Sequence, residues 1–146
     1  EERVNVTGAY LTMQREVAQR VVCRPCSRTY GGLSVVCQLL TEAKILFYMR
    51  PSVFVPPPKV GSAFVSLTPR PEKIGVNGEL LAFVRATFQN KRKFLSHCLS
   101  KMYDANRIEK LYDFMGFSPK VRAEEVEPVR FEEMFRFLKG RLEAQT

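Results

Sequence analysis

The sequence lacks the features of membrane and secreted proteins. It contains no apolar run of about 20 residues, which is the length that a membrane-spanning helix needs. It begins Glu1-Glu2-Arg3, without an initiating Met and without the apolar segment of a signal peptide. We therefore expect no membrane contact, and we interpret the start as a truncation or a processed end.

The sequence also lacks the residue sets of common active sites. Its closest approach to a glycine-rich phosphate loop is the isolated pair Gly31-Gly32. No paired carboxylates stand in a pocket-forming pattern. A Ser/His/Asp set is missing because the only histidine, His97, lies in a basic helical stretch. The sequence thus predicts that this chain does not contain a complete active site.

Four cysteines, in a basic chain without a signal peptide, indicate free thiols and a reducing compartment. Cys23 and Cys26 have the spacing of a metal-ligand pair, but Cys37 and Cys98 do not form a second close pair. A zinc site or a redox pair remains a lesser alternative, and we predict no metal.

The charge is strongly positive and unevenly distributed. The chain has 146 residues, 45% of them apolar, with 23 Lys and Arg against 15 Asp and Glu, so the net charge is +8. This composition allows a real core and favours a polyanionic partner, above all nucleic acid. Between residues 85 and 101 there are five basic residues and no acidic one: Arg85, Lys91, Arg92, Lys93 and Lys101. Such a run is also typical of a solvated helix face, and that alternative stays open.

The first 70 residues show a mixed α/β pattern. Short β-compatible or buried-strand runs alternate with a helical stripe and a uniformly apolar segment, and the order predicts a strand, two helices and two further strands. The ranges are 4–11 (strand), 14–22 (helix), 33–40 (helix), 43–48 (buried strand) and 62–68 (half- to fully-buried strand), with a basic loop at 25–32. These elements make only part of a sheet, and sheets in α/β proteins need both faces covered. We therefore expect part of the domain to be missing upstream.

The periodicity becomes helical after a linker at 69–77. Apolar stripes predict four to five helices, with Gly116 just after one helix end. Ser118-Pro119 is typical of a helix start, and the last helix is expected at about 129–142. The predicted fold is thus an α/β part, residues 1–70, followed by a small all-α bundle, residues 71–146.

One proline-rich loop, residues 51–63, holds an aromatic ring at Phe54. Its four prolines fix their own φ angles and remove backbone donors, so the loop is stiff and is neither helix nor central strand. A ring on such a loop either stacks on a flat ligand such as a nucleobase or folds back as a lid on the core.

Four motifs, in order, resemble one known family. They lie at residues 13–20 (MQREVAQR), 30–38 (YGGLSVVCQ), 54–63 (FVPPPKVGSA) and 88–95 (FQNKRKFL). Each is weak alone, but their order and intervals match the KsgA-type ribosomal RNA adenine dimethyltransferases across nearly the whole chain. The resemblance implies an S-adenosylmethionine-dependent enzyme that dimethylates two adjacent adenines near the 3′ end of small-subunit rRNA.

The resemblance also implies that this chain is incomplete. It would be the last part of a Rossmann-like methyltransferase domain followed by the small helical domain. The family's Gly-rich cofactor turn, its acidic ribose-binding residue and its Asn-Leu-Pro-Tyr motif all precede this segment. The chain alone is therefore expected neither to bind S-adenosylmethionine nor to turn over.

Roles carried over by position are few. Phe54 is similar to the loop aromatic that stacks on the flipped target adenine. Lys59 would contact phosphate or cap the loop, and the best RNA-backbone candidates are Lys91, Arg92 and Lys93, with Arg85 and Lys101 beside them in sequence. Gln14 and Glu16 would face the target pocket or, for Glu16, complement the helix dipole. Tyr30 and Gln38 are expected to hold loop and sheet together.

Two glycines depart from the family pattern. Gly32 stands where a basic residue is usual, and Gly61 where an acidic one is usual. RNA contacts or loop anchoring at these two positions are therefore in doubt.

Three hypotheses follow. The first is the C-terminal portion of the dimethyltransferase, whose partners are small-subunit rRNA or a pre-ribosomal particle and the N-terminal methyltransferase segment as a separate chain or missing region. The second is a non-catalytic RNA-binding ribosome-assembly protein or organellar transcription-factor derivative on the same scaffold. The third is a zinc-stabilised module. The compartment would be bacterial cytoplasm or an organelle, mitochondrion or plastid.

Overall fold

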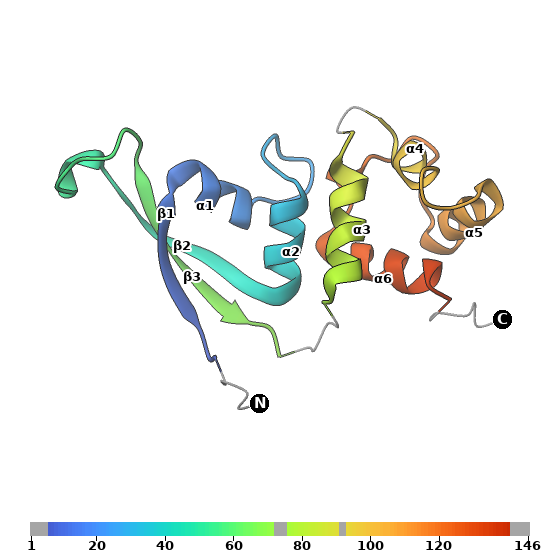
Figure 1. Ribbon diagram of the computed structural model, residues 1–146, viewed down its shortest axis with the longest axis horizontal. Helices are drawn as coiled ribbons and strands as arrows, with labels where there is room; N and C mark the ends of the chain where they lie inside the picture. Colours follow the sequence, from blue (N-terminus) through green and yellow to red (C-terminus); the bar gives the residue numbers. More distant parts are fainter. Residues whose placement is uncertain (1–5, 72–75, 91–92, 141–146) are drawn as a thin grey trace.

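A small antiparallel sheet stands at one end of the molecule and a cluster of helices at the other (Figure 1). The computed structural model describes residues 6–71, 76–90 and 93–140. The elements are β1 (Ala9–Gln14), α1 (Arg15–Val22), α2 (Gly32–Leu40), β2 (Thr41–Met49), β3 (Ser62–Pro69), α3 (Gly78–Phe88), α4 (Leu95–Leu99), α5 (Ala105–Met115) and α6 (Pro128–Leu138), with 3₁₀ helices at Pro51–Val53 and Ala123–Glu125. None of the helices in these ranges is long and apolar enough to cross a membrane.

The sheet has the strand order β1-β3-β2, and β3 runs antiparallel to both neighbours. Val65 lies at its centre, opposite Leu11 of β1 and Ile45 of β2. Ala63 and Val65 of β3 are buried against α1 and form a small core with Ala18, which agrees with the predicted alternation in this strand. The expected strands and helices of this part are confirmed, although β1 begins later than predicted and β2 extends further at both ends.

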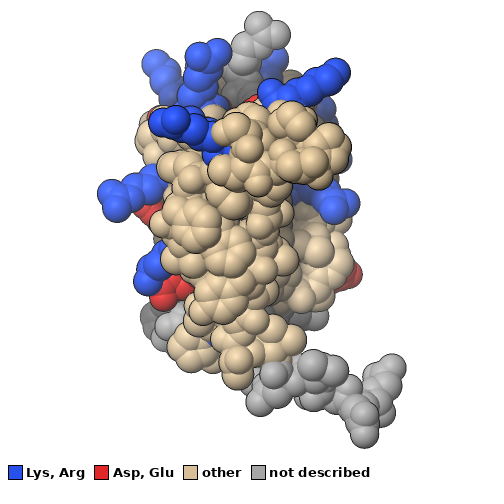
Figure 2. Space-filling view, turned by 90° about the vertical axis from the view of Figure 1, so that its left-hand side faces the viewer, with Lys and Arg blue, Asp and Glu red and all other residues tan. Residues whose placement is uncertain are grey.

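The opposite face of the sheet carries a row of aromatic rings that cross all three strands. The Phe64 ring lies 6.2 Å from that of Tyr10 and 5.2 Å from that of Phe47, between centroids. Tyr10 is 67% exposed and Phe47 52% exposed. Figure 2 shows the molecule from the side of β1, with a broad uncharged area in the middle of this face. No described element covers this row.

The expectation that residues 43–48 form a buried strand is wrong. They pair as a strand, but none of them is buried: Ala43 and Ile45 are partly buried and Lys44 is exposed. Beyond a bulge between Ile45 and Phe47, Leu46, Phe47 and Tyr48 are all about half exposed.

The second core is larger and joins the two parts of the chain. It contains Tyr30, Val35 and Leu39 from the region of α2 together with buried residues of every later helix. Phe131 of α6 is its largest fully buried side chain and stacks on Phe88 of α3, with 5.5 Å between the ring centroids. α2 thus packs on the sheet with one side and on α3 and α6 with the other.

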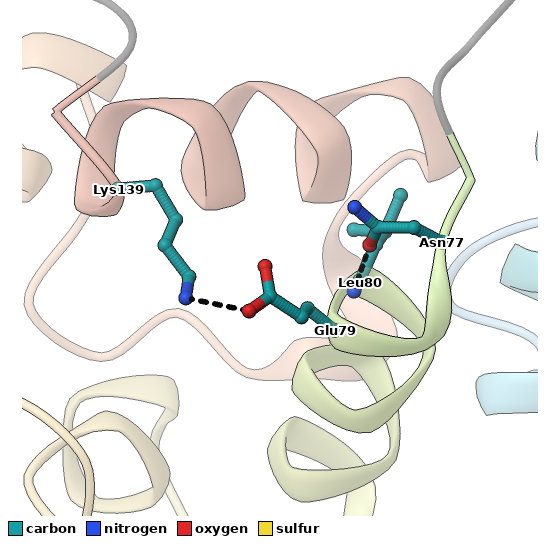
Figure 3. A network of polar contacts seen from close by, with 4 residues as sticks. All are labelled: Asn77, Glu79, Leu80 and Lys139. Carbon is teal, nitrogen blue, oxygen red and sulfur yellow. Dashed lines mark hydrogen bonds and ion pairs between the residues drawn. The ribbon is translucent and has the colours of Figure 1, made fainter.

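Polar contacts are made at the start of α3 and near the end of α6. The Asn77 side chain accepts a hydrogen bond from the Leu80 amide and caps α3, and Glu79 pairs with Lys139 after α6 at 3.3 Å (Figure 3). The cap fixes the first turn of α3, and the Glu79–Lys139 pair links that turn to the end of α6.

Gly116 ends α5 in the left-handed conformation, with φ at 63°, as predicted. The prediction that a helix starts at Ser118-Pro119 is wrong. The chain makes a turn there, and α6 begins only at Pro128. α6 also ends at Leu138, earlier than predicted, and Gly140 follows with φ at 68°. Residues 141 and 142 of the expected helix lie outside the described residues.

Candidate nucleic-acid interface

The loop between β2 and β3 projects from the sheet at the far left of Figure 1. Its first turn is the 3₁₀ helix Pro51–Val53, closed by a hydrogen bond from the Phe54 amide to the Pro51 carbonyl at 3.2 Å. Phe54 is partly buried but belongs to neither hydrophobic core. The neighbouring Val55 is 99% exposed. The Phe54 ring is therefore partly supported by its own loop and does not serve as a lid on a described core.

The base of the loop is fastened to the junction of β1 and α1. The Arg15 amide donates to the Gly61 carbonyl at 2.9 Å, and the Arg15 guanidinium lies 4.8 Å from the centre of the Tyr48 ring. Arg50, directly before the loop, is exposed. Sequence reasoning missed Arg15, Tyr48 and Arg50, because only the register of β1, β2 and β3 shows that they flank one loop.

Gln14 and Glu16 lie beside this junction. Gln14 is exposed at the end of β1, opposite Ser62. Glu16 lies in the first turn of α1 and pairs with Arg20 at 2.6 Å. That ion pair and the dipole of α1 account for Glu16 without a ligand.

Three loops follow one edge of the molecule, the upper edge in Figure 1: the loop of Phe54, the loop before α2 and the connection from α3 to α4. Each of these loops carries exposed basic residues, among them Lys59, Arg24, Arg28 and Lys93. In Figure 2 many Lys and Arg side chains gather at the upper end of the visible face. The connection from α3 to α4, which carries Lys93, is therefore one part of a longer basic edge.

The predicted basic residues stand on the helical part of this edge and beside it. Arg85 is exposed in the last turn of α3, Lys93 follows α3, and Lys101 follows α4. None of these three, nor Lys59, forms an ion pair with another residue in the described ranges. Lys91 and Arg92 lie outside the described residues. The loop of Phe54 and the helical cations thus lie on separate elements and are separate candidates for contact with a nucleic acid.

The buried Tyr30 and the partly buried Gln38 connect the elements beneath this edge. The Tyr30 hydroxyl donates to the Val126 carbonyl at 2.7 Å, across to the helical part. Burial raises the pKa of Tyr30 well above its ordinary value, and the nearby Glu127 carboxylate adds to the shift. The Gln38 amide donates to the carbonyls of Val21 and Cys23 and holds α2 to the end of α1. The loop before α2 is therefore fixed from both sides.

The cysteines take up ordinary structural positions. Cys23 contacts the Arg20 carbonyl and the Ser34 hydroxyl, each at 3.2 Å from its Sγ. Burial raises the pKa of the Cys37 thiol. Within the described residues no group of three or more His, Cys, Asp or Glu could hold a metal ion. The geometry gives no support to the zinc-stabilised module.

Comparison with known proteins gives one consistent result. Residues 1–139 match the family model described as ribosomal RNA adenine dimethylase. Curated relatives named ribosomal RNA small subunit methyltransferase A include those of Methylobacterium radiotolerans, 45% identical over 81% of this chain and 40% of the relative, and Gloeobacter violaceus, 39% identical over 83% of this chain and 45% of the relative. The chain spans less than half the length of these relatives.

Solved structures show the same fold. A dimethyladenosine transferase from Plasmodium falciparum superimposes with a TM-score of 0.78 at 20% identity, over 93% of this chain and 58% of that one. The 23S rRNA methyltransferase ErmE gives a TM-score of 0.59 at 24% identity, over 91% of this chain and 55% of that one. Together with the family match over residues 1–139, these findings show that the chain belongs to the ribosomal RNA adenine dimethylase family, whose members are S-adenosylmethionine-dependent methyltransferases.

Proposed function

We propose that this chain is the C-terminal portion of an rRNA adenine dimethyltransferase that modifies two adjacent adenines near the 3′ end of small-subunit rRNA. Residues 1–70 would be the last part of its Rossmann-like methyltransferase domain, and residues 71–146 its RNA-binding helical domain. The site of action would be bacterial cytoplasm or an organelle.

The uncovered sheet face is the observation that carries this proposal. The row of Tyr10, Phe64 and Phe47 exposes a contiguous apolar surface, and β1 pairs with a described strand on one side only. An antiparallel sheet can face water on one side, but such a face normally carries polar side chains, and a contiguous exposed apolar patch marks an interaction surface. Since the relatives are about twice as long as this chain, we expect the segment that they have in addition to pack on this face.

The hollow beside the sheet does not fit S-adenosylmethionine. The hollow of about 290 Å³ between α1 and α2 is lined by Arg20 and Arg28, and its one carboxylate, Glu16, already pairs with Arg20. A cofactor with a sulfonium and an ammonium group would meet like charge there. The methyl donor would therefore be bound by the absent segment, and this chain would bind and orient the RNA.

Phe54 is our candidate for the target-adenine contact. A base has to leave its stack before its exocyclic amine can be methylated, and an aromatic ring compensates for the lost stacking. The partly buried ring on a proline-rich loop, with Arg15 and Arg50 near the base of the loop, has the required shape and charge. Its role is positioning, because holding the amine near the methyl group lowers the barrier.

The basic edge is our candidate for the RNA backbone contact. Lys59, Arg85, Lys93 and Lys101, with Lys91 and Arg92 from outside the described residues, supply the cations. Contacts of this kind position an A-form helix by its shape and phosphates and do not read its sequence.

The test is to restore the missing segment. The part of the Methylobacterium radiotolerans relative that precedes its match to this chain is fused to residue 1, and methyl transfer from labelled S-adenosylmethionine to unmethylated small subunits is measured. We expect two dimethylated adenines per subunit. A folded fusion that binds the subunits and the cofactor without methylating them would contradict the enzyme and favour the non-catalytic derivative.

In this fusion, Phe54→Ala should lower methylation by about tenfold or more, because stacking contributes on the order of 1–3 kcal/mol per base. Affinity for the subunit should stay nearly unchanged, since phosphate contacts supply most of it. Phe114→Ala, at an exposed aromatic residue on α5, is the matched control and should change neither quantity. Equal losses of methylation and affinity in Phe54→Ala would exclude the stacking role.

A further inference from the structure

A second hollow lies in the helical part, between α4, α5 and the turn after α5. Its volume is about 780 Å³. Five residues of α5 line it at the spacing of one helix face: Ala105, Ile108, Glu109, Tyr112 and Asp113. α4 and α5 stand at the end of the molecule opposite to the sheet (Figure 1). The hollow is therefore remote from the face that the missing segment would cover.

The charge of this hollow is opposite to that of the chain. No Lys or Arg of the described residues lines the hollow, whereas Asp104, Glu109 and Asp113 do, together with His97. Asp104 has a structural role, because it caps α5 by accepting a hydrogen bond from the Arg107 amide at 2.9 Å. Glu109 and Asp113 form no ion pair within the described ranges.

Glu109 and Asp113 are exposed and carry an electrostatic cost on α5. They are four residues apart on α5, where like charges repel each other. Asp113 also stands in the last turn of the helix, whose dipole disfavours a negative charge, and no basic residue in that turn compensates for it. A bound cation would offset both the repulsion between Glu109 and Asp113 and the unfavourable interaction of Asp113 with the helix dipole.

The floor of the hollow is apolar and aromatic. Ile108 is buried, and the Tyr112 and Phe117 rings meet edge to face with 5.8 Å between centroids. The Tyr112 hydroxyl is buried near Ser96 but makes no well-formed hydrogen bond within the described residues. Aromatic rings and carboxylates together suit a cation that has an apolar stem.

We propose that this hollow docks a basic segment of another protein, with an arginine or lysine side chain between the Tyr112 ring and the carboxylates of Glu109 and Asp113. The Phe117 ring already has the Arg130 guanidinium 4.7 Å from its centre and serves only as the apolar floor. RNA is disfavoured here because its phosphates would face three carboxylates. The same protein would thus bind RNA along its basic edge and a protein partner at its helical end.

The test is a titration of the isotope-labelled chain, followed by NMR, with the peptide acetyl-Ala-Arg-Leu-Arg-Ala-amide. We expect shifts at Ser96, Tyr112 and Asp113, and none with the matched peptide in which Gln replaces both Arg. Glu109→Gln/Asp113→Asn should weaken peptide binding about fivefold, as expected for the loss of two exposed ion pairs. The control Glu42→Gln/Glu127→Gln makes the same change in net charge outside the hollow and should leave binding at this site nearly unchanged.

Three outcomes would overturn the proposal: equal binding of the Gln peptide, unchanged binding in Glu109→Gln/Asp113→Asn, or shifts at these residues with a single-stranded tetranucleotide but not with the basic peptide. Both substituted residues are exposed, so the thermal midpoint should stay the same or rise slightly. If the double variant unfolds, Asp113→Asn alone serves the same comparison.

Discussion

Aromatic side chains are buried at the helical end of this chain and exposed at its sheet end. Phe131 in the helical part has no exposed surface, while Tyr10 and Phe47 on the sheet are more than half exposed. The later helices close around a core that they share with α2, whereas the sheet has helices on one face only. The difference indicates that the aromatic side chains of the helical end have their packing partners within the described residues, whereas those on the uncovered sheet face do not.

The largest expected effect tests this difference directly. Phe131→Ala should lower the free energy of unfolding by about 3–5 kcal/mol, because it leaves a large cavity in a closed core. Phe47→Ala, on the uncovered face, should cost less than about 1 kcal/mol in the chain alone. Urea unfolding of both variants measures the two values, and similar losses would mean that the sheet face is covered in solution, for example by a second copy.

The connection between the two ends is the next point to test. Tyr30→Phe removes the hydrogen bond to Val126 and leaves a buried carbonyl without its partner. We expect a loss of about 1–2 kcal/mol in the free energy of unfolding. Amide hydrogen exchange should show reduced protection on both sides of the contact, in α2 and in α6. Reduced protection on one side only would argue against a cooperative unit that includes both helices.

Alkaline pH should reduce the loss of stability that Tyr30→Phe causes. Burial raises the pKa of Tyr30 above its ordinary 10.0, so the folded state keeps the proton that the unfolded state loses. The contribution of Tyr30 is therefore complete below pH 10 and declines as the pH rises above it, by at most about 1.4 kcal/mol per pH unit. The difference in stability between the wild type and Tyr30→Phe should shrink between pH 10 and 11, and a constant difference would contradict the buried neutral phenol.

The smallest effect on stability, near zero, is expected for the exposed lysines at the two ends. In the fused protein, Lys59→Gln and Lys93→Gln should each weaken rRNA binding and reduce the slope of log affinity against log salt by about 0.7–0.9. Comparison of the two slopes shows which end contributes more phosphate contact. An unchanged slope would remove that lysine from the interface.

Much of the fold was predictable because short stretches of the sequence carry the patterns of individual strands and helix ends. Alternation in Ala63, Val65 and Leu67 and the glycine at 116 gave correct elements. The failures have local causes as well. Ser118-Pro119 has the residue types of a helix start, but the following segment instead makes a 3₁₀ turn in which Glu125 accepts from the Arg122 amide at 2.7 Å. Pro128 has the same preference for a first helical turn, and there the apolar stripe of α6 packs into the core.

The candidate interface was less predictable, because it depends on which loops the sheet and α2 bring to one edge. Phe54 and the cations at 85–101 stand out in the sequence, and their roles stay predictions. Arg15 and Tyr48 do not stand out, since 33 residues separate a guanidinium and a ring that lie 4.8 Å apart. The acidic hollow is likewise invisible in a composition whose net charge is +8.

The shared position of α2 has a consequence for how such proteins can be recombined. Val35 and Leu39 complete the core of the helices that follow, although they precede two strands of the sheet. A helical end transferred to another catalytic domain would keep its packing only if the host offered an equivalent of α2. Exchange of this part between relatives should therefore succeed as a graft onto a matching helix and fail as a simple exchange of C-terminal segments.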